Sequence, residues 1–117
     1  MPIRVRRSRT KGSKLPPNTV CVTRPGIFGN PFLVAKAEEA GYQNPPDNPN
    51  ALAGWCVSLF RQWLMGVGDP VPAFDGQRAK LLAALPTLRG KNLACFCLLD
   101  APCHADVLLL FANGGGL

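Results

Sequence analysis

What the chain has little of narrows its class before any motif is considered. Its 117 residues include one histidine and no apolar run near the roughly 18 residues that a membrane-spanning helix needs. The basic N-terminus lacks a following apolar segment, so we expect no secretory signal peptide. Five cysteines, an odd number, favour thiols or metal ligands over a disulfide framework. We therefore expect a soluble cytoplasmic protein without a membrane partner.

The chain also lacks internal repeats and any segment with the composition of a domain linker. Its length suits one core, so we predict a single domain over residues 1–117. Apolar periodicity and turn residues predict strands over 2–6, 19–23 and 93–98, helices over 33–41, 51–64 and 75–85, and a last helix that starts near 103. This order predicts an α/β domain with a mixed or mostly parallel sheet of three or more strands and about four helices.

Acidic residues are absent from the first fourteen positions, which hold six of the 13 arginines and lysines. The other seven basic residues balance the seven acidic ones, so residues 1–14 carry the whole net charge of +6. A basic N-terminal strand and loop of this kind is typical of contacts with phosphate on a nucleotide or nucleic acid. Arg9 and Lys11 are the candidate ligand-binding residues there. The alternative is a solvated basic arm.

The segment RPGIFGNPF, residues 24–32, follows the second predicted strand. Its two prolines lack backbone donors and exclude regular structure, so we predict a shaped loop at the strand end. Such loops commonly carry ligand contacts in α/β folds, and Arg24 with Asn30 suits a phosphate, a carboxylate or a base edge. Alternatively, Ile27, Phe28 and Phe32 only pack this loop against the core.

The segment from 92 to 113 holds three cysteines and the histidine. Cys95 and Cys97 are two apart on a predicted strand, which places both side chains on one face. Cys103 and His104 come at the predicted start of the last helix, where backbone N–H groups favour a thiolate. We therefore expect Cys97 and Cys103 to approach one another across the turn.

Three interpretations of this cluster stay open. The first is a zinc site made by Cys95, Cys97, Cys103 and His104, with an iron–sulfur cluster as a weaker form of the same idea. The second is a catalytic thiolate at Cys103, with His104 beside it and Asp106 orienting the imidazole or acting as general base. The third is structural, with buried thiols and with polar side chains that cap the helix.

Three stretches, TVCVTRPGIFGNPF, LFRQWL and LLAALPTLRGKNLACFCLLDAPCHADVLLLFAN, together with RTKG, resemble a family of small phage and bacterial proteins, domain of unknown function 4326. Its G-N-P-F and C-x-C…P-C-H-A-D motifs are both present, although Phe28 and Phe96 stand where that family often has tryptophan. The resemblance implies one α/β domain and a phage or prophage context, without implying an activity. It also implies a characteristic set of residues: Arg24, Gly29, Asn30, Pro31, Cys95, Cys97, Cys103, His104 and Asp106.

Both motif segments follow strand ends, so we expect them to frame one pocket. In it Arg24, Gly29 and Asn30, with Arg9 and Lys11, would hold a nucleotide or nucleic-acid ligand. The cysteine segment would bind metal or act on a base or its glycosidic bond. The alternative is a non-catalytic module, stabilised by zinc, that binds nucleic acid or inhibits a host factor.

Overall fold

The computed structural model describes residues 2–7, 14–24, 26–68 and 71–114. Its sheet has three parallel strands in the order β1-β3-β2. The strands are β1 (Arg4–Arg6), β2 (Thr19–Cys21) and β3 (Asn92–Cys95). The helices are α1 (Val34–Glu39), α2 (Ala51–Met65), α3 (Asp75–Ala84) and α4 (His104–Ala112), with 3-10 turns η1 (Pro72–Phe74) and η2 (Leu85–Leu88). The predicted α/β class and single small domain are confirmed.

The central strand is β3, whose Leu93 and Ala94 are fully buried. A parallel strand that is covered on both faces has a nearly continuous run of apolar residues, and this run predicted the strand from the sequence. The strand is nevertheless shorter than predicted, because it ends at Cys95 rather than at residue 98. Cys97 therefore lies in the connection after the strand, and the prediction that it stands on the strand beside Cys95 was wrong.

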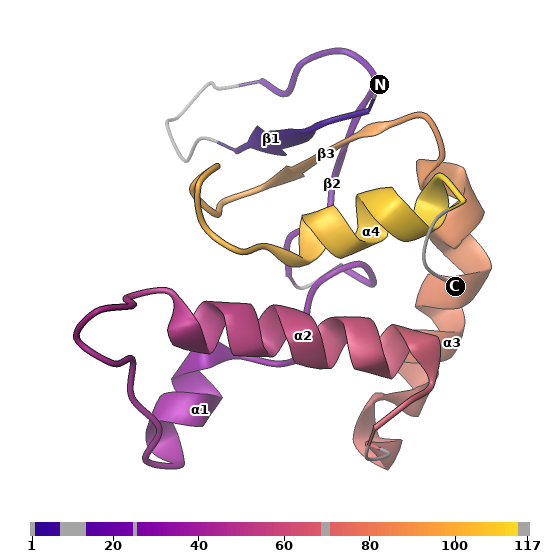
Figure 1. The fold of residues 1–117 in the computed structure, drawn as a ribbon. Helices are drawn as coiled ribbons and strands as arrows, with labels where there is room; N and C mark the ends of the chain where they lie inside the picture. Colours follow the sequence, from indigo (N-terminus) through magenta and orange to yellow (C-terminus); the bar gives the residue numbers. More distant parts are fainter. Residues whose placement is uncertain (1, 8–13, 25, 69–70, 115–117) are drawn as a thin grey trace.

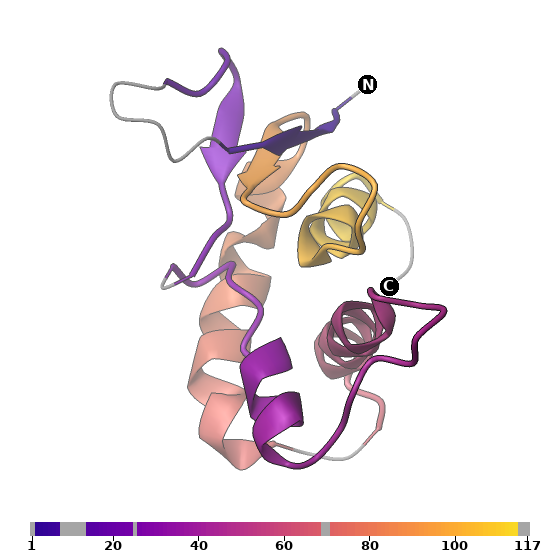
Figure 2. The ribbon, with the colours of Figure 1, turned by 90° about the vertical axis from the view of Figure 1, so that its left-hand side faces the viewer.

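Helix α4 lies between the sheet and α2, as both views of the ribbon show (Figures 1 and 2). Most of its apolar residues are buried, and Leu108 joins Leu93 of β3 and Phe60 of α2 in one core. Within the described residues, no helix has both the length and the apolar character needed to cross a membrane.

The three strands run in the same direction, so their carboxyl ends meet at one edge of the sheet. The loop that starts at Arg24 leaves β2 at this edge, and the connection from β3 to α4 leaves it there too (Figure 1). In parallel α/β sheets this edge is where ligand sites are usually built.

Candidate metal centre and the adjoining cavity

One cavity of about 480 Å³ is lined by both motif segments. The loop after β2 and helices α1 and α2 supply Thr23, Arg24, Asn30, Phe32, Leu33, Val34, Ala35, Ala53, Cys56 and Val57. The connection after β3 and the start of α4 supply Cys95, Phe96, Cys97, Pro102, Cys103 and His104. Arg24 and Asn30 therefore share a cavity with the cysteine cluster, although more than 60 residues separate the two segments in the sequence.

Three residues of this wall gather their donor atoms tightly. Cys95, Cys103 and His104 are buried, and their ligand atoms all lie within 4.8 Å of one another. The Cys103 Sγ lies 3.8 Å from the His104 Nδ1. Tetrahedral zinc, with bonds of about 2.3 Å to sulfur and about 2.0 Å to nitrogen, separates its ligand atoms by roughly 3.5–3.8 Å. The cluster is thus suited to hold a metal ion with small side-chain adjustments.

The imidazole of His104 is oriented by the backbone that directly follows β2. Its Nε2 lies 2.8 Å from the carbonyl oxygen of Val22. A carbonyl only accepts, so Nε2 carries the proton and Nδ1 presents its lone pair toward Cys103. Metal-binding histidines are usually held in this way, with the second ring nitrogen donating to a carbonyl or carboxylate. Burial also lowers the pKa of His104, which favours the neutral form that binds metal.

The three thiols of the cluster share their protons unequally. Hydrogen bonds from Cys103 and Cys97 stabilise a thiolate at Cys95 and lower its pKa well below the usual range. The pKa of Cys103 is raised, because the Cys95 and Cys97 sulfurs and burial disfavour a second charge. The Ala105 N–H favours a Cys103 thiolate, yet it is outweighed. Within the cluster the thiolate is thus favoured at Cys95, and the thiolate expected at Cys103 stays a prediction.

Cys97 lies at the margin of the cluster. Its Sγ is 3.7 Å from the Cys95 Sγ, a separation that matches two sulfurs on one tetrahedral zinc. A hydrogen bond with Cys103 lowers its pKa, but the Cys95 sulfur and burial outweigh it, and the pKa is raised. Unlike the other three residues, Cys97 is only half-buried. It is the fourth ligand expected from the sequence, in a less enclosed position.

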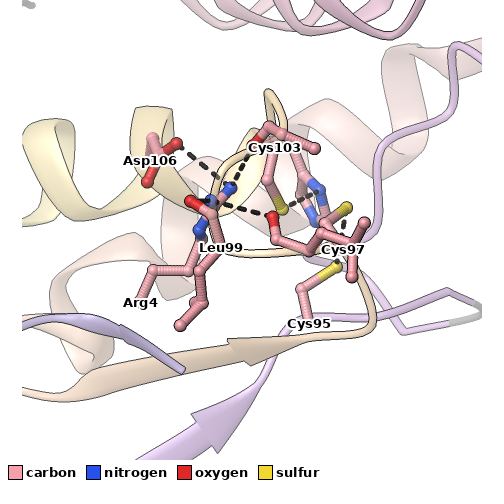
Figure 3. A network of polar contacts seen from close by, with 9 residues as sticks. Arg4, Cys95, Cys97, Leu99, Cys103 and Asp106 are labelled. Carbon is pink, nitrogen blue, oxygen red and sulfur yellow. Dashed lines mark hydrogen bonds and ion pairs between the residues drawn. The ribbon is translucent and has the colours of Figure 1, made fainter. Parts of the chain in front are cut away.

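The connection that bears Cys97 is held by Arg4 (Figure 3). The Arg4 guanidinium donates to the carbonyl oxygens of Ala101 at 2.9 Å and Leu98 at 3.1 Å, and also to that of Leu99. It pairs with Asp106 at 3.2 Å, and its side chain is 8% exposed. Arg4 thus connects β1 to the segment between Cys97 and Cys103. The sequence analysis counted Arg4 with the basic N-terminal segment. Arg4 and Arg6 both alternate with Val5, so the sequence does not show which of the two arginines is buried.

Asp106 has a different position from the one expected. Its carboxylate pairs with Arg4 and is 57% exposed, and the imidazole of His104 is oriented by Val22 instead. The structure therefore gives Asp106 a part in holding the connection. The interpretation in which Asp106 orients the imidazole was wrong.

The loop after β2 uses most of its polar groups internally. Asn30 is buried, its Nδ2 donates to the Cys56 carbonyl at 3.2 Å, and its Oδ1 accepts from the Phe32 N–H at 2.9 Å. Arg24 donates to the Asn30 carbonyl at 2.8 Å. A Cβ on Gly29 would lie 2.7 Å from the Arg24 Cγ, so only glycine lets the loop close here. Gly29 and Asn30 shape the loop, and Arg24 supplies its charge.

The family model described as "Domain of unknown function (DUF4326)" matches residues 5–114. The chain belongs to this family. The match contains both DUF4326 segments that meet at the cavity, and the family description names no activity. No curated protein and no solved structure matches the chain. The function of this DUF4326 member must therefore be argued from its own site.

Two further sets of residues complete the description of the predicted site. Arg9 and Lys11, the candidates in the basic arm, lie outside the described residues. Near them in sequence, Arg7 donates to the Cys21 Sγ at 3.0 Å and to the Thr23 Oγ1 at 3.2 Å. Burial opposes a Cys21 thiolate, but the Thr23 hydrogen bonds and the Arg7 charge outweigh it and lower the Cys21 pKa. Cys21 is a thiol outside the metal-suited cluster, which makes it a useful control.

Proposed function

We propose that this protein holds a zinc ion with Cys95, Cys103 and His104 and binds a phosphate-bearing ligand, such as a nucleotide, in the adjoining cavity. The observation that carries the proposal is the gathering of three buried donor atoms within 4.8 Å, on the wall of a cavity that Arg24 also lines. Catalytic zinc sites typically have three protein ligands and a remaining position that faces a pocket.

The donor set favours zinc over other metals. Two thiolates and one imidazole are soft or borderline ligands, which zinc accepts in tetrahedral geometry. Iron–sulfur clusters generally take four cysteines, and the donors here include an imidazole. When bound, such an ion would polarise an oxygen of the ligand or lower the pKa of a water molecule.

The wall of the cavity favours an anionic ligand with an apolar part. Among the described residues that line it, Arg24 is the permanently charged side chain and no carboxylate is present. Phe32, Leu33 and Val57 form an apolar portion of the wall. The volume of about 480 Å³ falls within the usual range for small-molecule sites. A nucleotide combines these properties, since its phosphate suits Arg24 and its base suits the apolar side.

A second candidate is a non-catalytic, zinc-stabilised module that binds nucleic acid. The Cys97 Sγ lies 3.7 Å from the Cys95 Sγ. This position favours the second candidate, because a fourth protein ligand would make a closed structural site. In that case the basic N-terminal segment would contact phosphate groups. Removal of the metal would then unfold the protein, as it does for small structural zinc domains.

Elemental analysis of the purified protein, followed by calorimetric titration with AMP, tests the two candidates. We expect one zinc per chain and AMP binding that weakens in the Arg24→Gln variant, which loses the charge but keeps a donor for the Asn30 carbonyl. One zinc with no AMP binding, together with salt-sensitive binding of DNA, would favour the module. A protein purified anaerobically without metal, and unable to take up zinc, would contradict both.

A further inference from the structure

We propose that Cys97 is a displaceable ligand of the metal centre. In this arrangement Cys95, Cys103 and His104 hold the ion permanently, and Cys97 completes its coordination while the cavity is empty. A donor atom of the cavity ligand then takes the Cys97 position. The inference rests on the proposed zinc site and extends it by naming which ligand yields and what replaces it.

The four donors differ in how firmly the fold holds them. Cys95 is 7% exposed and ends the central strand, where its carbonyl accepts from the Arg7 N–H at 2.7 Å. Cys103 is 1% exposed, and His104, 6% exposed, begins α4 with its ring fixed by Val22. Cys97 lies outside both elements and is half-buried on the cavity wall. Cys95 and His104 are therefore held within regular structure, and Cys103 is held by its burial at the N-cap of α4, whereas Cys97 has neither support.

The distances separate Cys97 from the other three in the same way. The group of donors that all lie within 4.8 Å of one another comprises Cys95, Cys103 and His104. Cys97 lies 3.7 Å from Cys95 and is hydrogen-bonded with Cys103, but it is not part of the group. Its sulfur is thus near enough to bind the ion and is the donor least enclosed by the others.

The connection around Cys97 limits where its sulfur can go. Arg4 fixes the later part of the connection through the carbonyls of Leu98, Leu99 and Ala101. Movement of the sulfur is then a matter of one side-chain torsion, and a change between staggered rotamers shifts it by roughly 3 Å. Such a shift breaks the metal–sulfur bond without moving the backbone. The site can open and close while the other three ligands stay in place.

The replacing ligand is an anion with an oxygen or nitrogen donor. The Cys97 position faces a cavity whose permanent charge is Arg24 and whose remaining wall is largely apolar. In the exchange the metal–sulfur bond breaks, a bond from the metal to the donor atom forms, and the released thiolate takes a proton from water. No electron is transferred. A nucleotide satisfies the charge and the size of the cavity.

Cobalt substitution provides the test, because the absorption from thiolate to Co²⁺ reports how many sulfurs are bound. In a Cys21→Ser background we expect Cys97→Ser to retain one Co²⁺ per chain with about one third less of this absorption. Cys103→Ser should lose the ion. Azide should shift the visible spectrum of the Cys97→Ser protein, since the vacated position faces the cavity.

Alkylation provides a second readout in the same Cys21→Ser background. We expect iodoacetamide to modify Cys97 at least tenfold faster than Cys95 or Cys103 while Co²⁺ stays bound. The inference is overturned if Cys97→Ser loses Co²⁺ as Cys103→Ser does, or if azide leaves the spectrum of Cys97→Ser unchanged. It is also overturned if iodoacetamide modifies Cys97 no faster than it modifies Cys95 and Cys103. A parent protein that binds no Co²⁺ would instead defeat the metal site itself, so the two failures are distinguishable.

Discussion

The two walls of the cavity are both marked by conspicuous motifs, yet they are built differently. On the side of β3 and α4, donor atoms of Cys95, Cys103 and His104 point together and are suited to a common ion. On the side of the loop after β2, Asn30 and Gly29 are occupied with the shape of the loop itself. The first wall supplies donor atoms for a metal ion. The second supplies the shape of the cavity and one charged side chain, that of Arg24.

This difference has a consequence for experiments. Changes in the first wall should abolish metal binding and lower stability together. Changes in the second wall should weaken ligand binding while the metal stays bound. If a change in the second wall caused loss of the metal, the two walls would be more closely coupled than their contacts indicate.

The largest effect is expected from Cys103→Ala. Loss of a buried ligand should weaken zinc binding by more than about 100-fold, because even partners that only orient a ligand are worth 10- to 100-fold. Competition with a chelator of known affinity measures this, and thermal unfolding with and without zinc gives the accompanying loss of stability. Cys21→Ser, a cysteine outside the cluster, should keep one zinc per chain. Equal affinities in the two variants would remove Cys103 from the metal centre.

Arg4→Met should have the next largest effect. It removes the guanidinium that binds the carbonyls of Leu98 and Ala101, and hydrogen bonds from a charged donor contribute about 1.5–3 kcal/mol. We expect the free energy of unfolding in urea to fall by about 2–3 kcal/mol.

Asp106→Asn is the matched control for Arg4→Met. It removes only the ion pair with a carboxylate that is largely exposed, so the loss should stay below about 1 kcal/mol. If Asp106→Asn destabilised the protein as much as Arg4→Met, the ion pair rather than the carbonyl contacts would hold the connection.

Gly29→Ala tests the second wall. The added Cβ would lie 2.7 Å from the Arg24 Cγ, so the arginine must move away from its place on the cavity. We expect AMP affinity to fall about tenfold, or about 1.4 kcal/mol, with zinc content unchanged. Gly76→Ala is the control, because nothing lies within 4 Å of its added Cβ. Loss of zinc in Gly29→Ala would contradict the division between the walls.

The smallest effect concerns pH in the metal-free protein. Burial lowers the pKa of His104 below its usual 6.5. Below pH 6.5 the imidazole therefore takes up a proton more readily in the unfolded chain than in the folded chain. Stability from this group is present above about pH 6.5 and is lost as the pH falls below it, by at most about 1.4 kcal/mol per unit. His104→Asn should flatten this part of the pH profile of urea unfolding. An unchanged slope would mean that His104 does not titrate differently in the two states.

The sequence predicted the fold because its signals are local. The apolar run of β3 and the periodic apolar residues of α2 and α4 depend on neighbours within a few positions. The sequence also predicted that Cys97 and Cys103 approach one another, because one turn joins the strand to the helix, and their side chains are hydrogen-bonded.

The contacts that were missed join distant parts of the chain. Arg4 contacts Ala101 across 97 positions, and His104 contacts Val22 across 82. Neither contact leaves a pattern in the surrounding residues. Arg4 was therefore counted with the basic N-terminal segment, and one of the three interpretations of the cluster gave the orientation of the imidazole to Asp106. Arg4 thereby holds three carbonyls, those of Leu98, Leu99 and Ala101, in the connection that follows β3.

Anomalous diffraction at the zinc absorption edge, from crystals of the protein as purified, tests the central claim most directly. We predict a single peak about 2.3 Å from the Cys95 and Cys103 sulfurs and about 2.0 Å from the Nδ1 of His104. A crystal from zinc-containing buffer that shows no peak between these residues would contradict the account. So would a peak bound through Nε2, because that nitrogen is committed to the Val22 carbonyl.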